Sequence, residues 1–301
     1  MSDSNKTAGA VSSFRAAASH ETTGERLGPL RDLPGFWEGT GFNLIARPNF
    51  SGGNTNGFFL ELNLLRETLE FRPIGSPVFN RGSLQADIAI YGLTYLHRVT
   101  DATTGGALHI EPGVWLNIPA TTAPQSHASI ARLATIPHGN AVCTVGHAEN
   151  LVFDRLPDIP PANTVPFKIG EAAPPPGTKN PFPEYDLSAP NTFRTDPLPA
   201  EITQALIDDP NGIVRDALQG QYLTKVVRLI TSTPPDGGIG NIPFIVKNAD
   251  TLNLRSVFDI ETIQRPTGEK FQQLQYSQTA LLNFGGLSWP HVTAGTLIKA
   301  F

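Results

Sequence analysis

Hydrophobic and polar residues alternate with a period of two along most of this chain, which is the pattern of β-strands with one buried face. Turn sequences rich in Gly, Pro, Asn and Asp separate the alternating segments. The pattern predicts strands at 36–42, 58–71, 87–99, 108–118, 129–136, 141–147, 222–231, 251–263 and 270–284. Because no helical pattern alternates with these segments, consecutive strands are expected to pair antiparallel. We therefore predict an all-β fold, a closed antiparallel up-and-down β-barrel of about ten strands, which is wide enough to hold a ligand.

Residues 150–220 interrupt the strand pattern. Twelve of the 27 prolines lie between Pro157 and Pro199, and proline has no N–H to donate to a sheet. Two short helices are predicted after them, at 199–208 and 211–220. We interpret 150–220 as an insertion over the barrel, which is either a lid or a loop that lines the wall. Residues 1–30 are polar and weakly patterned and are predicted to form a flexible N-terminal arm, which leaves 31–301 as a single domain.

The composition narrows the classes of function. Charged residues make up 16% of the 301 residues and the formal net charge is -5, without a basic cluster, which disfavours nucleic acid as a partner. The single cysteine, Cys143, excludes a disulfide framework and a metal site built from cysteines. No segment has the length and apolar character of a signal peptide or a membrane span, so a cytoplasmic location away from membranes is expected.

A histidine and a glutamate share one face of the predicted strand 108–118. His109 and Glu111 alternate with aliphatic residues such as Leu108 and Ile110, which share the opposite face. If the polar face points into the barrel, the pair could orient a ligand or transfer protons. If the aliphatic face is the core, the pair is a solvated surface feature.

His291 follows the last long predicted strand and the dipeptide Trp289-Pro290. A neutral imidazole between a tryptophan and an aliphatic tail suits the axial position of a heme iron. It also suits a packing role near the chain terminus, and the pattern alone leaves both readings open. Surface or turn positions are predicted for four other histidines, which are His97, His127, His138 and His147.

Three separated stretches resemble the nitrobindin family, the calycin-like, heme-binding ten-stranded barrels related to fatty-acid-binding proteins. They are Gly-Phe-Trp-Glu-Gly-Thr-Gly at 35–41, His-Ile-Glu-Pro-Gly-Val-Trp at 109–115 and Pro-His at 290–291. They are similar to the family's G-x-W-x-G-x-G opening, its H-x-E-x-G-x-W strand and its C-terminal P-H. The chain departs from the family at 44–48, where Leu-Ile-Ala-Arg-Pro stands in place of the usual Tyr-Pro-Thr-Ile.

The resemblance implies that heme b is the cofactor and that His291 is the metal ligand of its iron. It also favours the inward orientation of the polar face of strand 108–118, which makes His109 and Glu111 the predicted catalytic residues. Residues expected to contact the heme or its propionates are, besides His291, Trp37, Thr40, Phe42, Arg47 and Trp289.

The leading hypothesis is a b-type heme protein whose iron keeps its sixth position open for nitric oxide, peroxynitrite or a peroxide. The resemblance implies isomerisation of peroxynitrite to nitrate, and the insertion suggests a heme peroxidase, oxygenase or dehydratase acting on an apolar organic substrate in a covered cavity. The alternative is a heme-free carrier of a fatty acid or another small hydrophobic molecule. A cofactor-free enzyme using His109 and Glu111 is a third reading, and a homodimer is one open oligomeric state.

Overall fold

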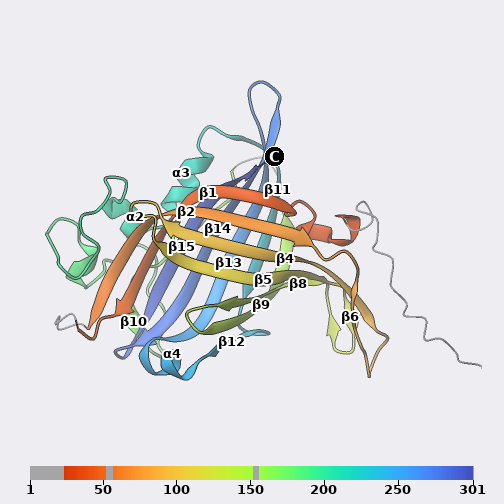
Figure 1. The fold of residues 1–301 in the computed structure, drawn as a ribbon, viewed down its shortest axis with the longest axis horizontal. Coiled ribbons are helices and arrows are strands. Elements are labelled where there is room, and N and C mark those ends of the chain that lie inside the picture. The colour runs from red at the N-terminus through yellow and green to blue at the C-terminus, as the bar shows by residue number, and fades with distance from the viewer. Residues whose placement is uncertain (1–23, 52–56, 152–155, 301) are drawn as a thin grey trace, which may run out of the picture.

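The chain folds as a closed β-barrel in the computed structural model, which describes residues 24–51, 57–151 and 156–300 (Figure 1). Within these ranges ten long strands pair antiparallel in sequence order, and the last pairs with the first to close the barrel. The strands are β1 (Gly35–Pro48), β2 (Phe58–Pro73), β4 (Ile88–Asp101), β5 (Ala107–Ile118), β8 (Ser129–Ile136), β9 (Asn140–Asn150), β11 (Tyr222–Ser232), β13 (Asp250–Gln264), β14 (Lys270–Phe284) and β15 (Leu287–Ala300). The predicted fold class is thereby confirmed.

Shorter strands pair with strands of the barrel or with one another. β3 (Val78–Asn80) pairs with β4, β12 (Gly238–Asn241) pairs with β9, β10 (Phe167–Lys168) pairs with β15, and β6 (Thr121–Thr122) pairs with β7 (Gln125–Ser126). The helices are η1 (Gly28–Leu30), η2 (Pro183–Tyr185), α2 (Gln204–Asp208), α3 (Gly212–Leu218) and α4 (Pro243–Asn248). The two predicted helices correspond to α2 and α3, whereas α4 was not predicted. In the described ranges, no helix combines the length and the apolar character that a membrane crossing requires.

The segment that follows the Gly285-Gly286 turn differs from its prediction. The sequence suggested a histidine followed by a short tail, but Leu287–Ala300 forms a full strand, β15, that pairs with β14 on one side and β1 on the other. Val292, Ala294 and Leu297 of this strand are fully buried. His291 therefore lies inside the last strand of the barrel rather than at the end of one.

The glycines of β1 allow two close approaches. A Cβ atom on Gly39 would lie 2.1 Å from the carbonyl oxygen of Thr296 on β15, so only glycine permits this spacing of the two strands. A Cβ atom on Gly41 would lie 2.5 Å from the Glu67 carboxylate. The glycine pattern of the sequence thus serves strand closure and leaves room for a charged side chain inside the barrel.

A hydrophobic cluster fills the barrel at the end where β1 begins. It contains Trp37 and Trp115, both almost fully buried, and Leu27 and Leu30 from the segment before β1. The indole N–H of Trp37 donates to the carbonyl of Leu33 over 2.8 Å. Ordered packing therefore begins before residue 31, within the predicted arm, while the arm's residues 1–23 lie outside the described ranges.

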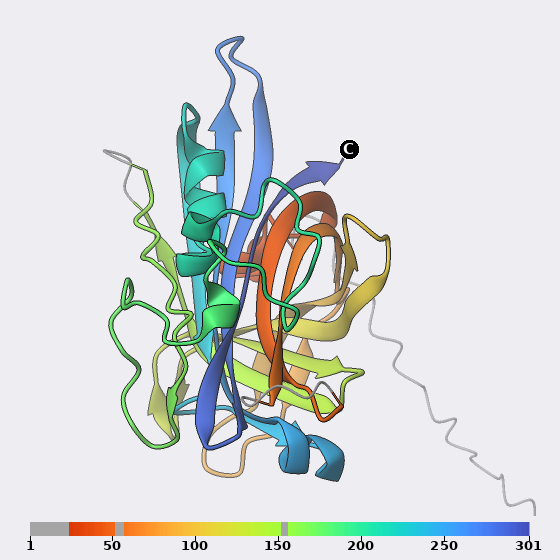
Figure 2. The ribbon, with the colours of Figure 1, turned by 90° about the vertical axis from the view of Figure 1, so that its left-hand side faces the viewer.

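The described part of 150–220, the predicted insertion, covers the side wall of the barrel (Figure 2). A second hydrophobic cluster joins the outward side chains of Phe42, Leu44 and Leu60 to Tyr185 and Ile207 of the insertion. The amide of Gln275 on β14 donates to the carbonyl of Val214 in α3, which anchors the same segment. The described part of 150–220 is thus packed against the wall, and a lid function stays a prediction.

Candidate functional site

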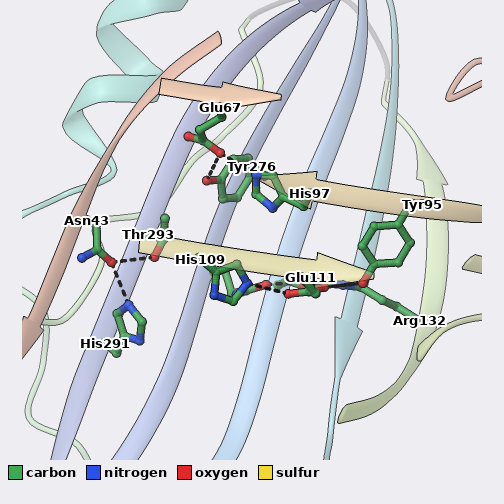
Figure 3. A network of polar contacts seen from close by, with 12 residues as sticks. Asn43, Glu67, Tyr95, His97, His109, Glu111, Arg132, Tyr276, His291 and Thr293 are labelled. Atoms are coloured by element: carbon green, nitrogen blue, oxygen red, sulfur yellow. Dashed lines mark hydrogen bonds and ion pairs between the residues drawn. The ribbon is translucent and has the colours of Figure 1, made fainter. Parts of the chain in front are cut away.

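The inner face of the barrel carries a set of polar side chains beyond the end filled by tryptophans (Figure 3). Strand pairing places these residues in neighbouring rows, for example Asn43 opposite Asn63 and His97 opposite Glu111. Hydrogen bonds and ion pairs join them into three groups, which are Asn43–Asn63–Asp101–His291–Thr293, Glu67–His97–Tyr276 and Tyr95–His109–Glu111–Arg132.

His291 lies on β15, and its ring is held by a side chain of β1. The distance from Nε2 of His291 to Oδ1 of Asn43 is 2.7 Å, and the hydroxyl of Thr293 donates to the same oxygen over 3.1 Å. Burial and the nearby His109 and His138 lower the pKa of His291 to about 3. The imidazole is therefore neutral at physiological pH, and part of its surface stays accessible.

Two further side chains extend the contact of Asn43. The Nδ2 group of Asn43 donates to Oδ1 of Asn63 over 3.1 Å, and Nδ2 of Asn63 donates to the Asp101 carboxylate over 2.8 Å. Asp101 also accepts hydrogen bonds from Thr103 and Thr104 in the hairpin turn that follows β4. The His291 ring is thus connected through two amides to a carboxylate held in a turn.

His109 and Glu111 both point into the barrel, which is the orientation that the resemblance favoured. Their side chains are 3.2 Å apart, from Nε2 to Oε2, and Glu111 is almost fully buried whereas His109 is partly exposed. Burial would raise the pKa of Glu111, but the Arg132 guanidinium and the His109 and Tyr95 hydrogen bonds lower it well below its usual range. Glu111 is therefore an ionised acceptor at neutral pH, and His109 donates to it through Nε2.

Arg132 neutralises the charge of Glu111 inside the barrel. Its Nε and Nη2 groups donate to Glu111, and Nε also donates to the Tyr95 hydroxyl. Its Nη1 group donates to Oε1 of Gln278 on β14 over 2.7 Å. The guanidinium carbon also lies 5.4 Å from the Phe258 ring centroid. Since both charged side chains are at most 3% exposed, this is a buried, hydrogen-bonded ion pair.

A second buried carboxylate, Glu67, was missed by the sequence reasoning. One of its oxygens accepts from Nε2 of His97 over 2.7 Å and from the Tyr276 hydroxyl over 2.6 Å. Its other oxygen has no hydrogen-bond partner within the described ranges. The available signal was the strand pattern of β2, where Glu67 shares a face with Leu65 and Leu69.

The inward position of His97 corrects its prediction as a surface or turn residue. Its ring is buried and packs edge-on against Tyr276, with centroids 5.8 Å apart. His138 is exposed in its turn as expected, although its ring centroid lies 6.1 Å from that of His109. His127 and His147 are exposed, and His147 bonds to Glu149 on the outer surface.

The residues predicted to contact heme do not all gather around His291. Arg47 lies on the same face of β1 as Asn43, nearer the strand end, and forms an exposed ion pair with Glu61. Trp37 also shares that face, but it lies six positions before Asn43, which is about 20 Å along the strand. It is part of the hydrophobic core at the other end of the barrel. Thr40 and Phe42 alternate onto the outer face of β1.

Trp289 belongs to the cluster beneath the insertion, although it is close to His291 in sequence. Its ring stacks on Phe284 with a centroid distance of 5.0 Å and contacts Phe58 at 4.5 Å and Phe182 at 5.1 Å. Trp289 therefore packs the wall and the insertion together. Considering the described part of the chain, no group of three or more His, Cys, Asp or Glu side chains has the arrangement of a metal site.

Comparison with known proteins adds little to this geometry. No family model matches the chain, and no curated protein matches it. Among solved structures, the one titled "Crystal Structure of Rv2717c from M. tuberculosis" is similar, with 16% sequence identity and a TM-score of 0.45, over 95% of this chain and 99% of that chain. A likeness this distant says nothing about function.

Proposed function

We propose that this protein is a ligand-binding β-barrel of the b-type heme class, with His291 as the protein ligand of the iron. The observation that carries the proposal is the state of the His291 ring, which is neutral, faces inward from β15 and keeps part of its surface accessible. A neutral imidazole has the lone pair that an iron ligand requires, and a pKa of about 3 means that protons do not compete for it at neutral pH.

The surrounding residues fit a heme in two further respects. His109 is held through its Nε2 by the ionised Glu111, so its Nδ1 is left to exchange a proton or a hydrogen bond with a small molecule. Arg47 lies at the end of β1 on the same face as Asn43, where a cation can pair with a propionate if it leaves Glu61. One contact opposes binding, because Asn43 occupies the Nε2 atom that axial histidines commonly use.

When bound, heme supplies an iron with one coordination position open to nitric oxide, peroxynitrite or a peroxide. The chain itself supplies the position of the imidazole and a neighbouring group that transfers protons. Because Arg132 keeps Glu111 ionised, Glu111 acts by orienting His109 rather than by donating a proton. Whether an organic substrate shares the site is a separate question that a ligand screen answers.

A heme-free carrier is the second candidate, and the occupation of His291 Nε2 by Asn43, which leaves that nitrogen unavailable to an iron, favours it. The side chains around His291 already satisfy one another through Asn43, Asn63 and Thr293 without any ligand. A carrier would bind the polar end of a small hydrophobic molecule with His291 and His109. The two candidates differ in a single property, the presence of iron porphyrin.

The visible spectrum of protein purified after expression with a heme supply tests the proposal. We expect an intense Soret band that shifts on addition of cyanide or nitric oxide and is lost in His291→Ala. The matched control is His147→Ala, which removes an exposed histidine on the outer surface and should keep the band. A colourless protein that copurifies with lipid supports the carrier, and a band that survives in His291→Ala shows that another residue holds the iron.

A further inference from the structure

We propose that Asp101, Asn63 and Asn43 form a directional hydrogen-bond relay that fixes His291 as its Nε2–H tautomer in the ligand-free protein. Asn43 then occupies the nitrogen that a heme iron would take, so these three residues are positioning residues for the site. This inference rests on the proposed function for its consequence, but the relay itself is a property of the ligand-free chain.

The direction of the relay is set at Asp101. Its Oδ1 accepts from the backbone N–H of Thr103 over 2.8 Å, from that of Thr104 over 2.6 Å and from the Thr104 hydroxyl over 3.1 Å. Burial would raise the pKa of Asp101, but these bonds and the one from Asn63 lower it, so the group is an ionised carboxylate at neutral pH. A carboxylate only accepts hydrogen bonds.

Each amide in the relay therefore has one allowed orientation. Asn63 must turn its Nδ2 group towards Asp101, which leaves its Oδ1 facing Asn43. Asn43 must in turn donate through Nδ2 to that oxygen, which leaves its own Oδ1 facing the His291 ring. The Thr293 hydroxyl donates to the same Oδ1, which this orientation allows.

The acceptor in Asn43 decides the tautomer of His291. Because the neutral ring carries one N–H, and Nε2 faces an acceptor at 2.7 Å, the proton lies on Nε2. Nδ1 then carries the lone pair and has no hydrogen-bond partner in the ranges that the structure describes. Nε2 could hold an iron only if the ring proton moved from Nε2 to Nδ1, which would keep the ring neutral, and if Asn43 gave up its bond.

Nitrogen NMR of the ligand-free protein with ¹⁵N-labelled histidine tests the relay without any heme. We expect the His291 ring to show a protonated Nε2 and an unprotonated Nδ1 at neutral pH. Asn43→Leu and Asn63→Leu each break the relay without touching the turn at 101–106, and they should shift the ring towards a mixture of tautomers. The control Thr293→Val removes a bond to the same oxygen but keeps the relay, so the ring should remain Nε2–H.

Heme titration of the same variants measures the consequence. Freeing Nε2 from one hydrogen bond should tighten heme binding in Asn43→Leu by roughly threefold to tenfold, the factor that corresponds to one net hydrogen bond. A wild-type ring protonated on Nδ1, or an Asn43→Leu protein with the wild-type tautomer and unchanged heme affinity, would overturn the inference. If the wild-type ring is Nε2–H but neither protein binds heme, the relay is upheld and the proposed function fails.

Discussion

Replacing the buried Glu261 with glutamine should stabilise the protein at neutral pH. Glu261 lies on β13 with no exposed surface, and one of its oxygens accepts from Gln273 over 2.7 Å. Its other oxygen has no hydrogen-bond partner within the residues that the structure describes. Burial, and then the charge of Asp259, raise the pKa of Glu261 to about 8 although Gln273 and Arg228 act in the opposite direction.

The sign and the size of the effect follow from this raised pKa. In the unfolded chain the carboxyl group ionises near its ordinary pKa of 4.5, whereas in the folded protein its pKa of about 8 keeps it protonated up to that pH. Its contribution to stability is therefore fully present below about pH 4.5 and is lost as the pH rises through 8. At about 1.4 kcal/mol per pH unit, the unfolding free energy of the wild-type protein falls by up to about 3 kcal/mol between pH 4.5 and pH 7.

The Glu261→Gln variant removes this pH dependence without changing the shape of the side chain. Glutamine keeps the acceptor for Gln273, and its N–H groups replace the equally unpaired O–H of the protonated acid. The two proteins should therefore be about equally stable near pH 4.5, and the variant should gain stability relative to wild type with each step towards about pH 8.

Urea unfolding followed by tryptophan fluorescence at several pH values between about 5 and 8 measures this difference. The matched control is Glu269→Gln, because the Glu269 side chain is 54% exposed and forms a surface ion pair with Arg265, so its curve should run parallel to that of the wild type. A constant difference between Glu261→Gln and wild type across the range would refute the reasoning. It would mean that Glu261 is ionised in the folded state and that Arg228 compensates its charge.

Three further predictions concern the barrel interior. Glu111→Gln leaves the buried Arg132 without its carboxylate and should lower the unfolding free energy by about 3–5 kcal/mol in urea titrations. Glu111→Leu combined with Arg132→Met removes both charges and should recover most of this loss. A double variant as unstable as the single one would contradict the pairing. Gly41→Ala should cost about 1–3 kcal/mol or more because its Cβ meets backbone and carboxylate atoms at 2.5 Å, whereas Gly240→Ala, whose Cβ has its nearest neighbour at 3.9 Å, should be close to neutral in the same assay. Since the folded pKa of His291, about 3, lies below its unfolded value of 6.5, its contribution is present above about pH 6.5 and is lost as the pH falls. His291→Gln should therefore lose less stability than wild type between about pH 6.5 and 4.5, and equal losses would show that the folded ring takes up a proton in this range.

Much of the candidate site follows from strand alternation once the barrel is assumed. His109 and Glu111 share a face with Trp115, and the structure places that face inside. The same rule separates Thr40 and Phe42 from the interior, since they alternate with Gly39 and Gly41. Glu67 and Arg132 were open to the same reasoning, because Glu67 lies between Leu65 and Leu69 on one strand face and Arg132 lies between Ile130 and Ala134 on another.

Partners across the barrel were beyond the reach of the sequence. Asn43 and His291 are 248 positions apart, and Glu67 and Tyr276 are 209 apart, so no local pattern connects them. Their contacts depend on the register between β1 and β15 and on the closure of the barrel. The same closure turned the expected tail after His291 into a strand, because β1 and β14 both offered it unpaired backbone groups.

The sequence by itself determined the antiparallel strands and the break in their pattern at 150–220, because residue alternation and turn composition act over short distances. Only the tertiary structure decided that the insertion packs on the side wall and that Asn43 holds the His291 ring. Register and closure bring together residues that are distant in the chain, and the free energy of those contacts appears only when the strands are paired.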